Sequence, residues 1–346
     1  MKIVETFQAQ ARACDELGSP LYGELLRRLV DDYERGGVST AVLAGHENDS
    51  GPSALALRLL GSVHRLVLAG EVPELAVFYP SVGGEWDPVL GWEAFEQVLH
   101  SHGGEVRSLL NQPPQTNEVG RAAALYGGLL RISGDLPVRL FEIGSSAGLT
   151  LRADHYRYDL ADGSSYGRPD SPVRIADAWP LGSLLTATGL RIVERVGSDI
   201  APVDPLSEQG RLTLTSYVWP DMTERLARLR GALEVAREVP ADIRREDAVS
   251  FLRAIEPVPE HLTVVWHSVM WQYLSPSDQE AGTAAIEALG AQASASAPVA
   301  QLSLEPGRRT PSSSHEFLVT ARVWPDGERR ILGVAAPHGV PVAWEV

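Results

Sequence analysis

The spacing of hydrophobic residues changes part-way along the chain. From Glu5 to about Ser133, apolar residues recur every three or four positions, the spacing that lines one face of a helix. One such run is Tyr22, Leu25, Leu26, Leu29 and Val30. Turn-forming groups, among them Gly18-Ser19-Pro20 and Tyr79–Gly84, interrupt the pattern. We therefore expect an all-α N-terminal domain over residues 1–133, with no strand before residue 138.

After Asp135-Leu136-Pro137, short apolar runs alternate with helical stretches, the pattern of a layered α/β sheet. The runs predict strands over residues 138–143, 192–198, 213–217, 243–245, 263–267 and 299–304. Two further apolar runs flank Pro325-Asp326-Gly327, a turn sequence that favours an antiparallel hairpin. The predicted fold class is α/β: a mostly parallel sheet with an antiparallel C-terminal hairpin over residues 134–346.

A turn of small residues follows the first predicted strand. Residues 140–148 read LFEIGSSAG. Glycines there let the backbone approach a ligand, and the start of a following helix offers free N–H groups and the positive end of its dipole. The pattern predicts a ligand site, and the competing interpretation is a tight strand-to-helix turn that binds nothing.

Two functional patterns can be compared with this turn directly. The dinucleotide pattern GxGxxG is not met, because Ser146 stands at its second glycine. The serine-hydrolase pattern GxSxG is met in letters over residues 144–148, with Ser146 as the nucleophile. His267 or His338 would then be the base and Asp247 the acid, although the strands that normally precede such a turn are lacking.

The segment also resembles a motif of a known enzyme class. Glu142-x-Gly144-x-Ser146-x-Gly148 is similar to the first motif of Rossmann-like S-adenosylmethionine-dependent methyltransferases, acidic-x-Gly-x-Gly-x-Gly, with Ser146 at the middle glycine. The resemblance implies that the turn, Ser145 included, packs against the methionine and ribose portions of the cofactor. It also implies that Glu142 helps to hold the amino end of the cofactor.

Two later segments match the same class in order. Residues 196–202 resemble its second-strand ending, which implies that Asp199 accepts hydrogen bonds from the ribose hydroxyls, with Asp204 as an alternative. A carboxylate suits a diol because it accepts two donors at once. Glu246-Asp247-Ala248 resembles the third-strand segment, which implies that the Asp247 side chain and the Ala248 backbone N–H recognise adenine.

The spacing of these segments is unusual. About fifty residues separate Gly148 from Asp199, more than connections within α/β units commonly need. We therefore expect an insertion around residues 156–185 that lies outside the core sheet.

Histidine and aromatic residues follow the fourth predicted strand. His267 comes at the carboxyl end of that strand, on the rim where ligands bind in open α/β sheets, so it is a candidate general base. A buried structural histidine is the competing interpretation. Tyr273 is a second catalytic candidate, and Trp219 and Trp271 are candidates for substrate contacts through their aromatic faces.

A proline-stiffened loop, Gln112–Glu118, precedes the sheet region. Its amide and carboxylate side chains would suit the charged methionine end of the cofactor, which makes Asn117 and Glu118 candidate cofactor ligands and Gln115 a candidate substrate ligand. The competing interpretation is an ordinary helix start, with Asn117 as N-cap and Glu118 as a first-turn acid.

The whole chain resembles a bacterial family known only as domain of unknown function 2332. The resemblance is carried by four segments: Gln115–Arg121, Glu142–Leu149, Ser216–Asp221 and His267–Tyr273. It implies the two-domain layout and nothing about the substrate.

Composition narrows the range of partners. The 346-residue chain exceeds the usual size of one core and carries a formal net charge of −15, which disfavours phosphate backbones and anionic lipid. Cys14 is the single cysteine, so no intrachain disulfide or multi-thiolate metal site can form. The first 18 residues lack the apolar core of a secretory signal. We expect a cytoplasmic protein with no nucleic-acid partner, no membrane partner and no metal.

These observations favour an S-adenosylmethionine-dependent methyltransferase that acts on a small molecule, with the helical domain as a lid or acceptor pocket. Three alternatives stay open: an enzyme of the same fold that consumes the cofactor without methyl transfer, a serine hydrolase, and a non-catalytic nucleotide-binding regulator. The acceptor and the oligomeric state cannot be inferred from the sequence.

Overall fold

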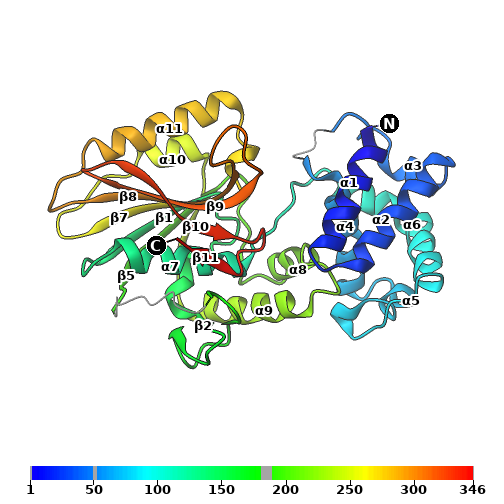
Figure 1. The fold of residues 1–346 in the computed structure, drawn as a ribbon. Helices are drawn as coiled ribbons and strands as arrows, with labels where there is room; N and C mark the ends of the chain where they lie inside the picture. The colour runs from blue at the N-terminus through cyan, green and yellow to red at the C-terminus, as the bar shows by residue number, and fades with distance from the viewer. Residues whose placement is uncertain (1, 50–52, 181–188, 346) are drawn as a thin grey trace. The chain divides into compact units, whose positions relative to one another are not determined.

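The computed structural model describes residues 2–49, 53–180 and 189–345 (Figure 1). The chain divides into two compact units. The first comprises Met1–Thr116 with Ser207–Ala227, and the second comprises Asn117–Leu206 with Arg228–Val346. The expected boundary lay at residues 133/134. In the structure, residues 117–133 belong with the sheet, and a later segment returns to the helical unit.

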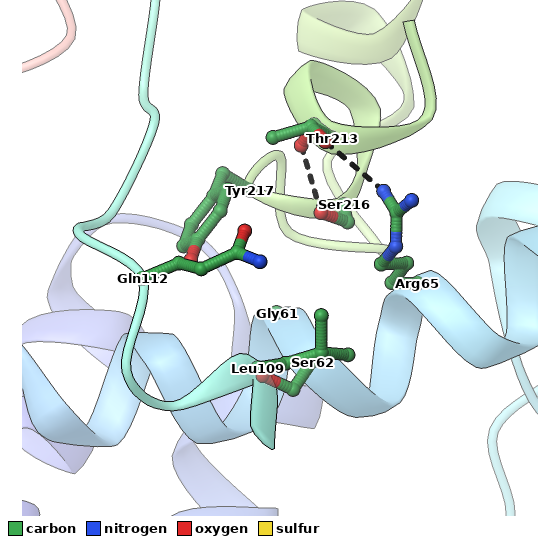
Figure 2. Close-up of a pocket in the computed structure, with 8 residues that line it drawn as sticks. All are labelled: Gly61, Ser62, Arg65, Leu109, Gln112, Thr213, Ser216 and Tyr217. Atoms are coloured by element: carbon green, nitrogen blue, oxygen red, sulfur yellow. Dashed lines mark hydrogen bonds between the residues drawn. The ribbon is translucent and has the colours of Figure 1, made fainter. Parts of the chain in front are cut away.

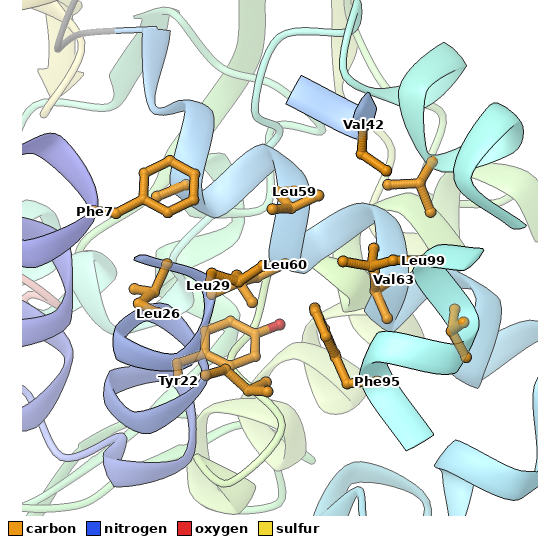
Figure 3. Packing of buried hydrophobic residues seen from close by; sticks show 14 of the residues in the cluster. Phe7, Tyr22, Leu26, Leu29, Val42, Leu59, Leu60, Val63, Phe95 and Leu99 are labelled. Atoms are coloured by element: carbon orange, nitrogen blue, oxygen red, sulfur yellow. The ribbon is translucent and has the colours of Figure 1, made fainter. Parts of the chain in front are cut away.

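The first unit is built from helices. Its elements are α1 (Lys2–Glu16), α2 (Pro20–Glu34), α3 (Val38–Leu43), α4 (Leu55–Ala69), α5 (Pro73–Ala76), η2 (Pro80–Val82), α6 (Leu90–Leu109) and α8 (Glu208–Ser216). Their apolar faces meet in one core, where Phe7, Tyr22, Leu60 and Phe95 pack together (Figure 3). The helical periodicity of the sequence reflects these buried faces.

The returning segment completes this helical unit. Trp219 is 6% exposed and packs in its core, with its ring 6.2 Å from that of Tyr22. Asp221 accepts hydrogen bonds from the Ser19 hydroxyl (2.6 Å) and the Leu21 backbone N–H (3.1 Å) at the start of α2. The sequence motif at residues 216–221 therefore serves the packing of the helical unit.

One predicted strand is wrong. Residues 213–217 were expected to be extended, but residues 208–216 form α8, whose N-cap Ser207 accepts a hydrogen bond from the Gly210 N–H. A short apolar run has too few residues for its period to separate helix from strand. Burial of Leu214 against the helical unit decides the outcome.

The second unit contains an eight-stranded sheet in the order β11-β10-β9-β8-β7-β1-β5-β6. The strands are β1 (Val138–Ile143), β5 (Ile192–Asp199), β6 (Asp242–Arg245), β7 (Leu262–Ser268), β8 (Val299–Gly307), β9 (Glu316–Trp324), β10 (Glu328–Ala335) and β11 (Val342–Trp344). Strands β8, β7, β1, β5 and β6 are parallel, and β9 to β11 are antiparallel. The predicted α/β class, with a mostly parallel sheet and an antiparallel C-terminal hairpin, is confirmed.

Helices cover both faces of this sheet (Figure 1). On one face, α10 (Ala248–Arg253) and α11 (Pro276–Gly290) pack through Phe251 and Ile286 against Val265 and its neighbours. On the other face lies α7 (Ala122–Ile132), where Gly128 allows close approach of Leu302. The remaining long helix is α9 (Thr223–Glu238). A sheet covered on both faces explains why its central strands β1, β7 and β8 are largely apolar.

The expected insertion forms a separate sheet of three strands: β2 (Arg157–Asp159), β3 (Ser165–Gly167) and β4 (Arg174–Ile175). The rings of Tyr158, Tyr126 of α7 and Trp179 cluster in nearly parallel planes, with centroid distances of 4.6 Å (Tyr158–Tyr126), 5.4 Å (Tyr158–Trp179) and 6.3 Å (Tyr126–Trp179). This aromatic stack anchors the insertion to α7. The end of the expected insertion, residues 181–185, lies outside the described residues.

Trp219→Ala is expected to lower the free energy of unfolding by about 3–5 kcal/mol, because it removes a buried aromatic side chain from the helical core. Urea unfolding followed by circular dichroism measures the loss. Tyr273→Ala is the control, since Tyr273 is 52% exposed. Equal stabilities of the two variants would contradict a core role for Trp219.

Candidate functional site

The carboxyl ends of the parallel strands meet at one edge of the sheet. From β1 the chain passes to β5 and β6 on one side, whereas β7 and β8 lie on the other side. The gap between β1 and β7 is therefore a topological switch point, where open α/β sheets commonly bind ligands. The turn after β1, residues 144–148, lies at this point.

The turn is tightly wound, and many of its backbone N–H groups donate hydrogen bonds to other protein atoms. Gly144, Ser146 and Gly148 all have left-handed φ angles, of 68°, 51° and 63°. The Ser146 N–H donates to the Asp199 carboxylate (2.9 Å), and the Leu149 N–H donates to the Asn117 side-chain oxygen (2.9 Å). Several N–H groups that sequence reasoning assigned to a ligand thus already bind protein atoms.

Most of the turn is also buried. Ser145 is fully buried, Ser146 is 5% exposed, and the side chain of Ile243 fills the space beside Gly148. Gly144 is the exposed residue of the turn. The expected α-helix after the turn is wrong: Thr150–His155 form η4, a 3-10 helix of 6 residues with a kink at Arg152.

Met270 packs on one side of the exposed Gly144. A β-carbon placed on Gly144 would lie 2.9 Å from the Met270 β-carbon and 3.0 Å from its γ-carbon. The glycine therefore allows Met270, which follows β7, to pack directly on the turn after β1. Sequence reasoning missed this contact, although Met270 lies within one of the family segments.

Glu142 is buried as a carboxylic acid. It is 2% exposed, and its Oε1 accepts a hydrogen bond from the Thr150 hydroxyl. Within the described residues, its Oε2 has no hydrogen-bond partner. Burial raises the pKa of Glu142 from its usual 4.5 to about 8, so the group is protonated at neutral pH. A neutral, enclosed acid differs from the charged ligand expected for the cofactor's amino end.

Asp199 organises the turn. Besides accepting from Ser146 through Oδ2, it accepts from the Ala201 N–H through Oδ1 (2.8 Å). Its backbone carbonyl accepts from the Glu246 N–H (3.1 Å), which joins the ends of β5 and β6. The alternative ribose ligand, Asp204, is exposed and accepts from the Leu206 N–H (2.9 Å).

Asp247 is exposed and acts as the N-cap of α10, accepting from the Ser250 N–H (2.9 Å). This backbone hydrogen bond holds the pKa of Asp247 below its usual value. Ala248 is the buried first residue of α10. Both residues lie at the carboxyl edge of the sheet, after β6, as the sequence order required.

The loop before α7 contributes one side chain to the turn. Asn117 contacts it through Leu149, whereas Glu118 is buried and caps η3 (Val119–Arg121) by accepting from the Gly120 N–H (3.0 Å). Gln115 is half-buried in the helical unit, the unit whose core contains Trp219.

His267 forms a buried polar chain. It is 4% exposed; its Nδ1 lies 2.8 Å from Glu305 Oε1 and its Nε2 lies 3.1 Å from the Gln301 amide nitrogen. Because the Gln301 amide donates to Nε2, Nδ1 carries the proton and donates to Glu305. Trp271 packs beside the ring (5.0 Å), while Tyr273 is exposed. Sequence reasoning missed Gln301 and Glu305, both on β8.

Glu142 and His267 lie on opposite faces of the sheet. Glu142 pairs with Trp266 in the ladder between β1 and β7. Directly paired residues point to the same face and successive residues point to opposite faces. Glu142 therefore faces α7, and His267 faces α10 and α11, so they do not converge on one reacting atom.

The serine-hydrolase triad is not assembled from Ser146, His267 and Asp247. His267 pairs with Glu305, whereas the proposed acid, Asp247, caps α10. The proposed nucleophile, Ser146, is buried within the turn.

A separate pocket lies in the helical unit (Figure 2). Its cavity volume is about 20 Å³, and Arg65 on its wall donates to the Thr213 hydroxyl (3.0 Å). Small-molecule pockets commonly span about 300–1,000 Å³. The space therefore suits solvent better than a substrate.

No three His, Cys, Asp or Glu side chains within residues 2–49, 53–180 and 189–345 converge as metal ligands would. Among the helices described, none has the length and apolar character needed to cross a membrane.

Comparison with known proteins places the chain in a family. A model described as "Uncharacterized protein conserved in bacteria (DUF2332)" matches residues 4–344. The chain belongs to the DUF2332 family. The predicted membership is thereby confirmed. A solved structure described as "DhpI-SAM-HEP complex" is 12% identical and has a TM-score of 0.23, covering 60% of this chain and 67% of its own. At that TM-score the similarity carries no argument about function. Among curated proteins, none matches this DUF2332 chain.

Glu142→Gln is expected to flatten the dependence of stability on pH. The folded state keeps the Glu142 proton up to about pH 8, whereas the unfolded chain loses it near pH 4.5. Its contribution to the free energy of unfolding is therefore full below pH 4.5 and is lost as pH rises through about 8.

Urea unfolding between pH 5 and pH 9 tests this difference. The wild type should lose more stability across this range than Glu142→Gln, which preserves the shape of the protonated acid. Parallel pH profiles for the two proteins would contradict a buried, protonated Glu142.

Proposed function

We propose that this DUF2332 protein is an S-adenosylmethionine-dependent methyltransferase that acts on a small molecule and binds the cofactor at the carboxyl edge of β1. The observation that carries the proposal is Gly144. It is exposed, has a φ of 68°, and lies at the switch point of a parallel sheet.

The arrangement of the neighbouring strands supports the proposal. Asp199 ends β5 and Asp247 follows β6, so the two carboxylates occur along the same edge as Gly144 and in the order that the methyltransferase motifs require. Asp247 is exposed and can accept further hydrogen bonds. Asp199 would reach a ribose only by sharing or exchanging its present bonds to Ser146 and Ala201.

The conformation in hand does not fit the cofactor at Gly144. The residue types suit it, since a bare glycine backbone and two carboxylates match an adenosyl group with a diol. The Met270 side chain, however, packs where a ligand would contact Gly144. Cofactor binding therefore requires Met270 to move.

In this proposal, His267 holds a proton at Nδ1 and Glu305 fixes that tautomer. Its Nε2 is the atom that would accept a proton from an acceptor molecule, and it is available only when the Gln301 amide turns away. Tyr273 is exposed on the same connection after β7 and is the second candidate group for acceptor contact.

Binding of S-adenosylmethionine and S-adenosylhomocysteine to the full chain, measured by isothermal titration calorimetry, tests the proposal. Both compounds should bind at one site per chain. Absence of heat and of any thermal stabilisation by either compound would overturn it.

Asp199→Asn should weaken S-adenosylmethionine binding by roughly 1–3 kcal/mol, because a partly buried carboxylate acceptor is lost from the turn and the diol site. Asp204→Asn is the matched control and should bind as the wild type does. Loss of affinity in Asp204→Asn alone would show that Asp204, and not Asp199, contacts the ribose.

His267→Ala should retain cofactor affinity but lose methyl transfer. The measurement is the incorporation of label from methyl-labelled S-adenosylmethionine into a bacterial metabolite extract. If affinity and label incorporation fall together, His267 is a structural residue.

A further inference from the structure

The connection after β7 contains a strained residue. Val269 has a φ of 49°, in the left-handed region. A β-branched side chain rarely adopts this conformation, because its branches crowd the backbone. Such strain persists only where surrounding contacts hold it, and it concentrates at sites that bind ligands or switch.

One carboxylate oxygen accepts hydrogen bonds from the two residues that follow Val269. Glu305 Oε1 accepts from the Met270 N–H (3.1 Å) and the Trp271 N–H (3.3 Å), and it also faces His267 Nδ1 (2.8 Å). The Val269 N–H donates to the Leu304 carbonyl (2.9 Å). The turn is thus tied to β8 on both sides of the strained residue.

The consequence is the placement of Met270 on Gly144. The left-handed residue turns the chain directly before Met270, whose β-, γ- and ε-carbons would lie 2.9, 3.0 and 3.2 Å from a β-carbon on Gly144. Methionine is flexible and unbranched, so its γ- and ε-carbons can leave this space by side-chain rotation, whereas its β-carbon moves only with the turn itself.

We propose that the turn Ser268–Trp271 is a gate that partly closes the cofactor site, with Met270 as a plug on the side of Gly144 where a β-carbon would point. This inference rests on the proposed function and concerns the regulation of the same site. The strain at Val269 raises the free energy of the closed form relative to the open form. S-adenosylmethionine therefore needs less of its binding free energy to displace Met270.

The gate makes opposite predictions for neighbouring residues. Met270→Ala keeps the β-carbon of the plug but removes its γ- and ε-carbons, and should strengthen S-adenosylmethionine binding by about tenfold, which corresponds to 1.4 kcal/mol. Val269→Gly relieves the strain of the closed form and should weaken binding by about tenfold. Val269→Asn should shift affinity in the same direction, since Asn tolerates the left-handed region.

Calorimetry on the full-length chain measures these affinities, and a thermal melt of each variant establishes that it is folded. Met222→Ala is the control, because Met222 packs against the core of the helical unit. Its affinity should equal that of the wild type. Hydrogen exchange of the Met270 and Trp271 amides gives a second readout, which should slow in Val269→Gly without any ligand.

The outcomes separate the gate from the function. Tighter binding by Met270→Ala with weaker binding by both Val269 variants supports the gate. If the wild type binds but these variants do not change affinity in opposite directions, the gate is overturned and the proposed function stands. If neither the wild type nor Met270→Ala binds, the proposed function fails and the gate fails with it.

Discussion

The hydrogen bonds between Asp199 and the turn after β1 are the constraint on which the edge of the sheet depends. Asp199 accepts from Ser146 through one oxygen and from Ala201 through the other. The left-handed angles of Gly144, Ser146 and Gly148 wind the turn tightly enough to present the Ser146 N–H to that carboxylate. The backbone N–H groups of Ser146 and Ala201 are therefore hydrogen-bonded within the protein, while Gly144 remains exposed.

The packing of Met270 on Gly144 bears directly on the proposed cofactor site. Two strand ends on either side of the switch point are brought into contact by the absence of a side chain at Gly144. The same glycine that would let a cofactor approach also lets a methionine approach. In the proposed gate, the free energy of the turn that Glu305 ties to β8 decides which of the two occupies the space.

Much of the sheet was predictable because its central strands, such as β1 and β7, are buried on both faces. The predicted strand at residues 138–143 agrees with β1 in full, and the runs at 263–267 and 299–304 lie within β7 and β8. Residues 213–217 failed because a short apolar run has the same appearance in a buried helix. The return of residues 207–227 to the helical unit depends on distant partners such as Ser19, which no local pattern reveals.

The candidate site was predictable in position and less so in detail. The motif placed Glu142, Asp199 and Asp247 at adjacent strands, as the sheet order shows. It did not reveal that Glu142 is enclosed as a neutral acid, that Asp247 caps a helix, or that Glu305 orients His267. Burial and pairing across strands decide these properties, and both arise only when the chain has folded.

The most direct test of the account is a crystal structure of the protein with S-adenosylhomocysteine. The account predicts the adenosyl group along Gly144, with the Met270 side chain displaced from the turn and carboxylates of β5 and β6 facing the nucleoside. A ligand bound elsewhere, with Met270 still packed on Gly144, would contradict it.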